Sequence, residues 1–113
     1  MVKEILKVVL IGTLLFARPT ALAQADPALI AKGEKIYGEK KCALCHMIKG
    51  KGGTAGPAAR GPDLSEVGTK QDAQGLKTYL KDPKAVNPKS KMMVFKGTDE
   101  ELEALVAYLA SLK

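Results

Sequence analysis

The chain has few of the residues from which metal sites and aromatic cores are built. It contains one histidine, two cysteines, no tryptophan and only three tyrosines and two phenylalanines among 113 residues. A structural zinc site needs four ligands, so the available cysteines and histidine are too few to form one. A chain this short also buries a modest fraction of its surface. We therefore expect its core to be thin without a bound group at its centre.

The sequence also lacks an apolar run long enough to cross a bilayer. The run over residues 8–17 has ten residues, whereas a hydrocarbon core needs about twenty. Two lysines precede this run, and residues 21–23 have the small-x-small form of a signal-peptidase site. We predict a cleaved signal peptide over residues 1–23, a periplasmic mature domain over residues 24–113, and no integral membrane span after cleavage. An uncleaved anchor is the alternative.

What the chain does contain is the motif C-x-x-C-H, formed by Cys42, Cys45 and His46. This is the spacing at which c-type haem is attached to a protein. The two thiols add across the vinyl groups on one edge of the porphyrin, and the next residue brings an imidazole under the iron. A redox-active dithiol is the alternative interpretation of the two cysteines. The motif predicts one covalent haem c.

The second axial ligand must come from elsewhere in the chain. His46 is the only histidine, so a methionine, a lysine or an open position remains. Met47 follows His46 too closely to reach the opposite face of the ring. Met92 and Met93 lie far downstream, between two predicted helices, where a thioether can approach that face. The alternative is that the two methionines fill irregular gaps in the core.

Capping signals and apolar periodicity predict an all-α fold. Asp26 is a candidate N-cap for a helix that runs to about residue 39, and proline follows it at the first helical position. Gly33 lies in the middle of this helix, where glycine costs up to about 1 kcal/mol relative to alanine. A close crossing by another helix would explain it.

Two further helices are expected in the second half of the chain. One runs from about residue 72 to residue 81. The other is C-terminal: Thr98 and Glu101 form a capping box ahead of an apolar stripe. Glycine and proline over residues 50–61 indicate a loop, and no alternating run of strand length occurs.

These features together resemble a small class I monohaem cytochrome c over essentially all of the mature segment. The residues that carry the resemblance are Gly33 to Tyr37, Cys42 to His46, Gly61-Pro62-Asp63-Leu64, Asn87-Pro88, Lys91-Met92 to Phe95-Lys96-Gly97, and Leu105 with Tyr108-Leu109. The resemblance implies the small cytochrome c fold, with about three to five short helices and long loops wrapped around one haem.

The resemblance also implies roles for residues around the iron. Met92 is the implied axial sulfur, because bacterial members often place it three residues before a phenylalanine, here Phe95. Members that place it two residues before point to Met93 instead. The Pro62 carbonyl is implied to accept a hydrogen bond from the imidazole of His46.

Two further implications concern packing. Leu64 would pack on the haem. Gly33 and Tyr37 would cross the C-terminal helix near Leu105 and Tyr108.

The function that follows is electron transfer without enzymatic chemistry. The chain is expected to be a monomeric carrier that cycles between Fe(II) and Fe(III) and meets redox partners through acidic patches on those partners. Seven lysines flank the motif or the methionine loop: Lys40, Lys41, Lys49, Lys51, Lys89, Lys91 and Lys96. Nucleic acid is not expected as a partner, because the positive charge of the exported segment is mild: residues 24–113 hold 15 lysines and arginines against 11 aspartates and glutamates. A haem-based sensor and a tightly bound haem subunit of a larger oxidoreductase are the alternatives.

Overall fold

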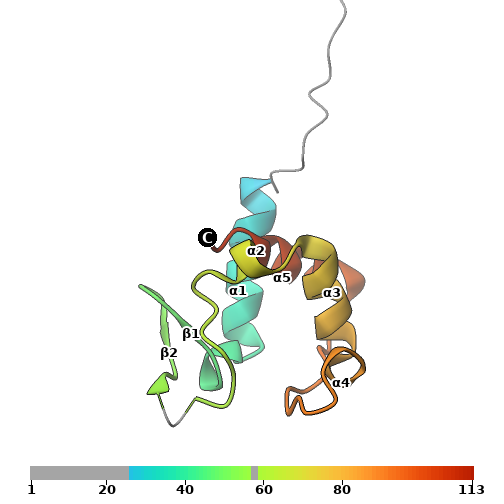
Figure 1. The fold of residues 1–113 in the computed structure, drawn as a ribbon. Coiled ribbons are helices and arrows are strands. Elements are labelled where there is room, and N and C mark those ends of the chain that lie inside the picture. Colours follow the sequence, from blue (N-terminus) through green and yellow to red (C-terminus); the bar gives the residue numbers. More distant parts are fainter. Residues whose placement is uncertain (1–25, 57–58) are drawn as a thin grey trace, which may run out of the picture.

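The computed structural model describes residues 26–56 and 59–113 (Figure 1). The predicted signal peptide and its cleavage site lie outside these residues. The elements in chain order are α1 (Pro27–Glu39), the 3-10 turn η1 (Cys42–Leu44), β1 (Met47–Ile48), β2 (Gly52–Gly53), α2 (Val67–Lys70), α3 (Ala73–Lys81), α4 (Pro83–Val86) and α5 (Asp99–Ala110). The predicted all-α class with short helices and long loops is confirmed. Within the described ranges, no helix is both long and apolar enough to cross a membrane.

The core is built where α1 crosses α5. A Cβ atom added to Gly33 would lie 1.9 Å from the carbonyl oxygen of Ala104 and 2.6 Å from Cβ of Tyr108. The rings of Tyr37 and Tyr108 meet edge to face, with 5.8 Å between their centroids. The predicted close crossing at Gly33 is therefore confirmed. Its contacts are Tyr108 and Ala104, the neighbour of Leu105, so the crossing lies where it was expected.

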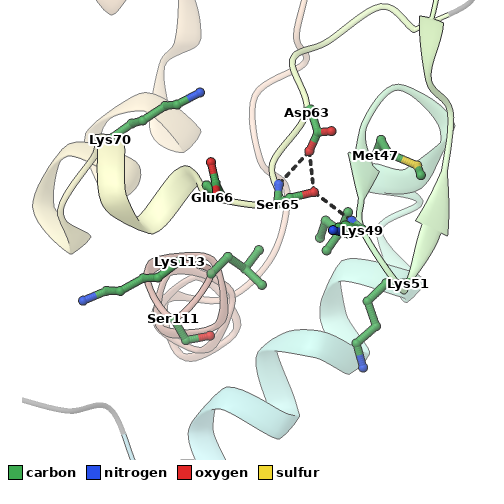
Figure 2. Close-up of a pocket in the computed structure, with 11 residues that line it drawn as sticks. Met47, Lys49, Lys51, Asp63, Ser65, Glu66, Lys70, Ser111 and Lys113 are labelled. Atoms are coloured by element: carbon green, nitrogen blue, oxygen red, sulfur yellow. Dashed lines mark hydrogen bonds between the residues drawn. The ribbon is translucent and has the colours of Figure 1, made fainter.

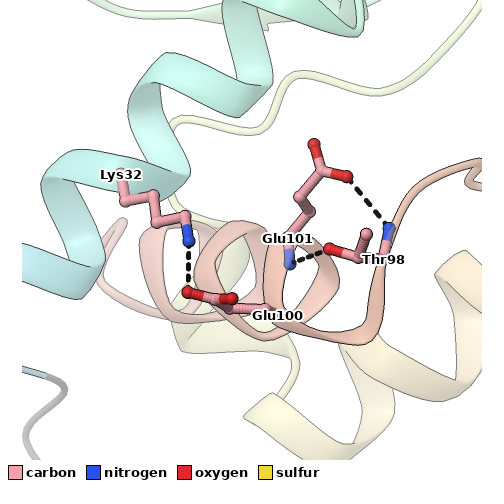
Figure 3. A network of polar contacts seen from close by, with 4 residues as sticks. All are labelled: Lys32, Thr98, Glu100 and Glu101. Atoms are coloured by element: carbon pink, nitrogen blue, oxygen red, sulfur yellow. Dashed lines mark hydrogen bonds and ion pairs between the residues drawn. The ribbon is translucent and has the colours of Figure 1, made fainter.

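Local capping explains where the two crossing helices begin. Asp26 caps α1 by accepting a hydrogen bond from the backbone N–H two residues later. At the start of α5, Glu101 N–H donates to Thr98 Oγ1 at 3.1 Å and Thr98 N–H donates to Glu101 Oε1 at 2.9 Å (Figure 3). Lys32 of α1 reaches Glu100 of α5 at 2.6 Å in the same view. The predicted capping box is confirmed, and an ion pair joins the two helices beside it.

Helices α2 and α3 pack on α5, and α4 packs on α3. Asp72 caps α3 by accepting a hydrogen bond from the N–H of Gly75 at 2.7 Å, which matches the predicted start of that helix. The buried apolar side chains come mainly from α1, α3 and α5: Ile36, Tyr37, Ile48, Leu76, Leu80, Leu102, Ala104, Leu105, Val106, Tyr108 and Leu109.

Several short elements were not expected from the sequence. The strands β1 and β2 pair antiparallel through Met47 with Gly53 and Ile48 with Gly52. β2 lies inside the segment predicted to be loop, and β1 lies just before it. Helices α2 and α4 each span four residues. Elements this short carry no periodic pattern, because a helical or strand period needs at least two repeats to be recognised.

Candidate functional site

The cysteines and the histidine are held together by one tight turn. Lys41 has a left-handed backbone, with a φ angle of 59°, and η1 follows it directly. Within the turn, the N–H groups of Cys45 and His46 both donate to the carbonyl oxygen of Cys42 at 3.1 Å. Neither thiol is in a disulfide, and both are partly buried. The turn thus presents two free thiols and an imidazole from five consecutive residues.

The ring of His46 is buried and held in a defined orientation. Its exposed fraction is 8%, and Nδ1 donates a hydrogen bond to the carbonyl oxygen of Pro62 at 2.8 Å. The contact implied by the family resemblance is therefore confirmed. Because Nδ1 carries the proton, Nε2 keeps its lone pair and is the ring nitrogen available to a metal.

Two glycines make room for His46. A Cβ atom on Gly61 would lie 2.3 Å from Cε1 of the imidazole, and one on Gly53 would lie 2.1 Å from the His46 carbonyl oxygen. Gly61 also donates its backbone N–H to the carbonyl oxygen of Cys45 at 3.0 Å. Any side chain at Gly61 would therefore collide with the imidazole ring, so this position requires glycine. Gly53 was not identified from the sequence, because its role depends on the pairing of β1 with β2.

A hydrogen-bonded loop supports this arrangement from outside. Ser65 donates its hydroxyl to Asp63 Oδ1 at 2.6 Å and its backbone N–H to the same oxygen at 2.8 Å. These bonds lower the pKa of Asp63. The Ser65 oxygen also accepts the N–H of Lys49 at 2.7 Å. The strand after His46 is thereby tied to the segment that carries Pro62.

A depression in the described surface lies beside this loop. Its volume is about 840 Å³, and Figure 2 shows its lining from β1 and the residues that follow it, from the segment that carries Asp63 and Ser65, from Lys70, and from the residues after α5. Cys42, Cys45, His46 and Met92 do not line it. The depression is therefore separate from the predicted haem-attachment residues.

The donor set fits a covalent haem better than a bare metal ion. Among the described residues, no group of three or more histidine, cysteine, aspartate or glutamate side chains could hold an ion. Burial raises the pKa of the Cys42 thiol, which favours the neutral thiol over a metal-binding thiolate. Two unbridged thiols and one imidazole with Nε2 available match what haem c requires.

One buried polar atom near these residues has no protein partner. Among the described side chains, the hydroxyl of Tyr37 is buried without a hydrogen bond. Burial, and secondarily the Cys42 thiol, raises the pKa of Tyr37 to about 12. The phenol is therefore neutral at ordinary pH.

The two candidate methionines differ sharply in their surroundings. Met92 is partly buried and packs against the hydrophobic core. Met93 is 82% exposed. The sequence alone left both residues open as ligands, since they are adjacent in one loop.

The loop before Met92 is anchored by a hydroxyl pair that the sequence did not reveal. The hydroxyls of Tyr79 and Ser90 share a hydrogen bond of 2.7 Å, and Met92 N–H donates to the Ser90 oxygen at 3.3 Å. Beyond Met92, the N–H of Phe95 donates to the carbonyl oxygen of Leu80 at 2.9 Å. Helix α3 therefore holds the loop on both sides of Met92. A buried serine two residues before a methionine carries no signal of its own in the sequence.

Comparison with known proteins gives a consistent result. The sequence profile of the family described as Cytochrome c matches residues 30–113. The chain is 38% identical over 125 residues to cytochrome c2 of Rhodospirillum rubrum, covering 87% of this chain and 89% of that protein. It is 32% identical over 99 residues to cytochrome c oxidase subunit 2 of Bacillus subtilis, covering 79% of this chain but only 28% of that protein.

A solved structure shows the same fold. The c-type cytochrome SorU of Sinorhizobium meliloti matches with a TM-score of 0.57 and 28% sequence identity, covering 77% of this chain and 93% of that one. Because the family profile matches most of the sequence and a cytochrome c2 is 38% identical to it, the chain belongs to the cytochrome c family, as a class I monohaem member that carries covalent haem c.

Proposed function

We propose that the protein is a periplasmic electron carrier. Cys42 and Cys45 would hold one haem c covalently, and His46 and Met92 would be the ligands of its iron. The observation that carries the proposal is the bond from His46 Nδ1 to Pro62, which aims a buried imidazole with Nε2 available. The signal-like pattern over residues 1–23 supports export.

Each residue has a distinct role in such a carrier. The haem, when bound, supplies the one-electron change between Fe(III) and Fe(II). His46 is fixed by Pro62 and Gly61, so its orientation need not change with the oxidation state. The soft thioether of Met92 favours the reduced metal and raises the potential relative to nitrogen ligation. With His46 and Met92 as ligands, the iron would have no open position for a substrate, which favours a carrier over an enzyme.

Burial and anchoring support Met92 over Met93. Met92 packs against the core and follows a segment fixed through Ser90 and Tyr79, whereas Met93 points into solvent. Such anchoring suits an iron ligand, because a side chain that is already ordered by folding loses little conformational entropy when it binds the metal.

Charge around the methionine loop supports an acidic redox partner. The residues that line a depression there include three with apolar side chains, three lysines and one carboxylate: Met92, Met93, Val94, Lys84, Lys91, Lys96 and Asp82. Met93 and Val94 are exposed. Lysines that outnumber acidic residues beside exposed apolar side chains suit a transient contact with a carboxylate-rich surface, because charge steers the encounter and apolar contact excludes water.

The test compares two single variants of the mature holoprotein. Met92→Ala should abolish the sulfur-to-iron charge-transfer band of the oxidised protein, lower the potential, and open the reduced iron to carbon monoxide. Met93→Ala is the matched control and should leave all three unchanged. The reverse pattern would assign the ligand to Met93. An unmutated protein that lacks the band and binds carbon monoxide readily would replace the carrier with a sensor.

A second candidate is a haem domain that works within a larger oxidoreductase. The chain spans about a quarter of the oxidase subunit 2 relatives it matches, 28% of one and 26% of another. It also matches the cytochrome c subunit of a menaquinol:cytochrome c reductase of Bacillus subtilis. Size-exclusion chromatography of the native protein distinguishes the two, since a free carrier migrates as a monomer.

A further inference from the structure

Thr54 makes two hydrogen bonds to the turn that carries the cysteines and the histidine. Its hydroxyl donates to the carbonyl oxygen of Ala43 at 3.1 Å, and its backbone N–H donates to the carbonyl oxygen of His46, also at 3.1 Å. Ala43 lies between the two cysteines, and His46 is the last residue of the motif. One residue from outside the motif therefore holds the turn at two points.

The two bonds supply donors that the turn does not supply itself. Inside the turn, the carbonyl oxygen of Cys42 accepts the N–H groups of Cys45 and His46, as described above. The carbonyl oxygens of Ala43 and His46 are paired with Thr54 instead. The bond between Ala43 and the Thr54 hydroxyl is partly buried. Because a partly buried carbonyl without a donor raises the free energy of the fold, these bonds favour the closed turn.

The pairing of β1 with β2 brings Thr54 to the turn. Met47 lies opposite Gly53 in this pair, so the next residues, His46 and Thr54, also face each other. Gly53 has a φ angle of 121° and leaves no room for a Cβ atom beside the His46 carbonyl oxygen. Its lack of a side chain allows the backbone of Thr54 to approach the motif. The β-branched side chain of Thr54 has few rotamers, which restricts the direction of its hydroxyl.

We propose that Thr54 is a positioning residue for the haem-attachment motif. By bonding to Ala43 and His46 together, it keeps the two thiols and the imidazole in the mutual arrangement that one covalent haem requires. This inference rests on the proposed function, because it takes Cys42, Cys45 and His46 to be the residues that hold the haem. The bonds join the turn to the end of β2 and not to the crossing of α1 with α5. Loss of the hydroxyl should therefore loosen the turn while the helices stay folded.

The matched pair for the test is Thr54→Val and Thr69→Val. Each substitution replaces a hydroxyl by a methyl group of similar shape. The Thr69 hydroxyl also donates to a backbone carbonyl oxygen, that of Glu66 at 2.7 Å, but this bond is local to the start of α2. Thr54→Val keeps the backbone N–H that donates to His46. Thr54→Ser is the rescue variant, because it restores the hydroxyl.

Hydrogen exchange of the reduced mature holoproteins, followed by NMR, is the first measurement. In Thr54→Val, the amides of Cys45 and His46 should exchange about 2 to 13 times faster, the equilibrium equivalent of one hydrogen bond. Amides in α5 should keep their rates. Thr69→Val should match the unmutated protein at all of these amides, and Thr54→Ser should return the rates of Cys45 and His46 toward the unmutated values.

The second measurement is the NMR shifts of the His46 ring protons in the same samples. The ring current of a bound haem makes these shifts sensitive to the position of the imidazole. They should change in Thr54→Val and stay unchanged in Thr69→Val. A purely stabilising role of Thr54 would lower the unfolding free energy without moving the ring.

Two results would overturn the inference while leaving the proposed function intact. One is equal acceleration of exchange in the turn and in α5, with unchanged His46 shifts, which would make Thr54 an ordinary stabilising residue. The other is unchanged exchange at Cys45 and His46 in Thr54→Val. If the unmutated mature protein loses its haem on denaturation, covalent attachment through Cys42 and Cys45 fails first, and the role of Thr54 fails with it.

Discussion

The crossing of α1 and α5 can be tested with a single methyl group. Gly33→Ala adds a Cβ atom 1.9 Å from the Ala104 carbonyl oxygen, whereas carbon and oxygen atoms in close contact lie about 3.3 Å apart. The helices would have to separate by about 1.4 Å, the difference between these distances. The obstacle is backbone, so a change of rotamer cannot relieve it.

The expected cost follows from the packing at this position. Forcing an extra carbon into a packed core costs about 1 to 3 kcal/mol, while replacing a helical glycine by alanine returns up to about 1 kcal/mol. Gly38 lies in the same helix, and a Cβ atom there would meet nothing within 4 Å. Gly38→Ala therefore shows the helix-propensity gain alone. The difference between the two variants isolates the collision.

Thermal unfolding of the two mature holoproteins is the measurement. A gap of about 1 to 3 kcal/mol corresponds to roughly 4 to 24 °C in Tm for a domain of this size. Gly38→Ala should melt at or slightly above the temperature of the unmutated protein, and Gly33→Ala clearly below it. Equal melting temperatures for the two alanine variants would refute the claim that α1 and α5 touch at Gly33.

Two further predictions concern the surroundings of the haem motif. Gly61→Ala places a Cβ atom 2.3 Å from the ring of His46, so its urea midpoint should fall by an equivalent of about 1 to 3 kcal/mol; an unchanged midpoint would contradict the close packing of this ring. Tyr37→Phe removes a buried hydroxyl without a partner and should preserve or increase stability at neutral pH. The Tyr37 phenol has a pKa of about 12 in the folded protein and about 10 when unfolded, so its contribution to stability is complete below pH 10 and is lost as pH rises toward 12. Unfolding midpoints measured from pH 8 to 12 should therefore fall less steeply in Tyr37→Phe, and parallel curves for the two proteins would argue against the raised pKa.

The crossing helices could be predicted because their signals are local. Asp26 directly precedes the first helix, and Thr98 and Glu101 are three residues apart. Each capping signal is therefore next to the helix that it begins, and both can be recognised in one short stretch of sequence. Gly33 could be interpreted because an interior glycine in a helix is costly unless something requires it. The partner atom, the carbonyl oxygen of Ala104, was beyond prediction, since it depends on the rotation of α5 about its axis.

The part of the site that consists of neighbouring residues in the sequence could be predicted. The part that depends on contacts between distant segments could not. Cys42, Cys45 and His46 form one five-residue motif with a known spacing. Neighbouring methionines look alike in a sequence, and only the loop's packing against the core distinguishes Met92 from Met93. The hydroxyl pair that anchors the loop joins residues eleven positions apart in different elements, a relation that no local pattern encodes.

Lysines that look equivalent in the sequence have different physical roles in the fold. Lys51 lies 2.6 Å from Glu34, and this pair ties the segment before β2 to α1. Lys40 pairs with Glu101 and covers Phe95. A charge neutralised by a neighbour contributes little to the long-range field, because the potentials of the two charges largely cancel beyond their separation. In the proposed carrier, the steering of an acidic partner would then come mainly from lysines beside the exposed part of the methionine loop, such as those that line the depression around Met93. Lysines paired with carboxylates inside the fold and lysines beside the exposed methionine loop are thus different residues, so we expect that stability and docking can be altered separately.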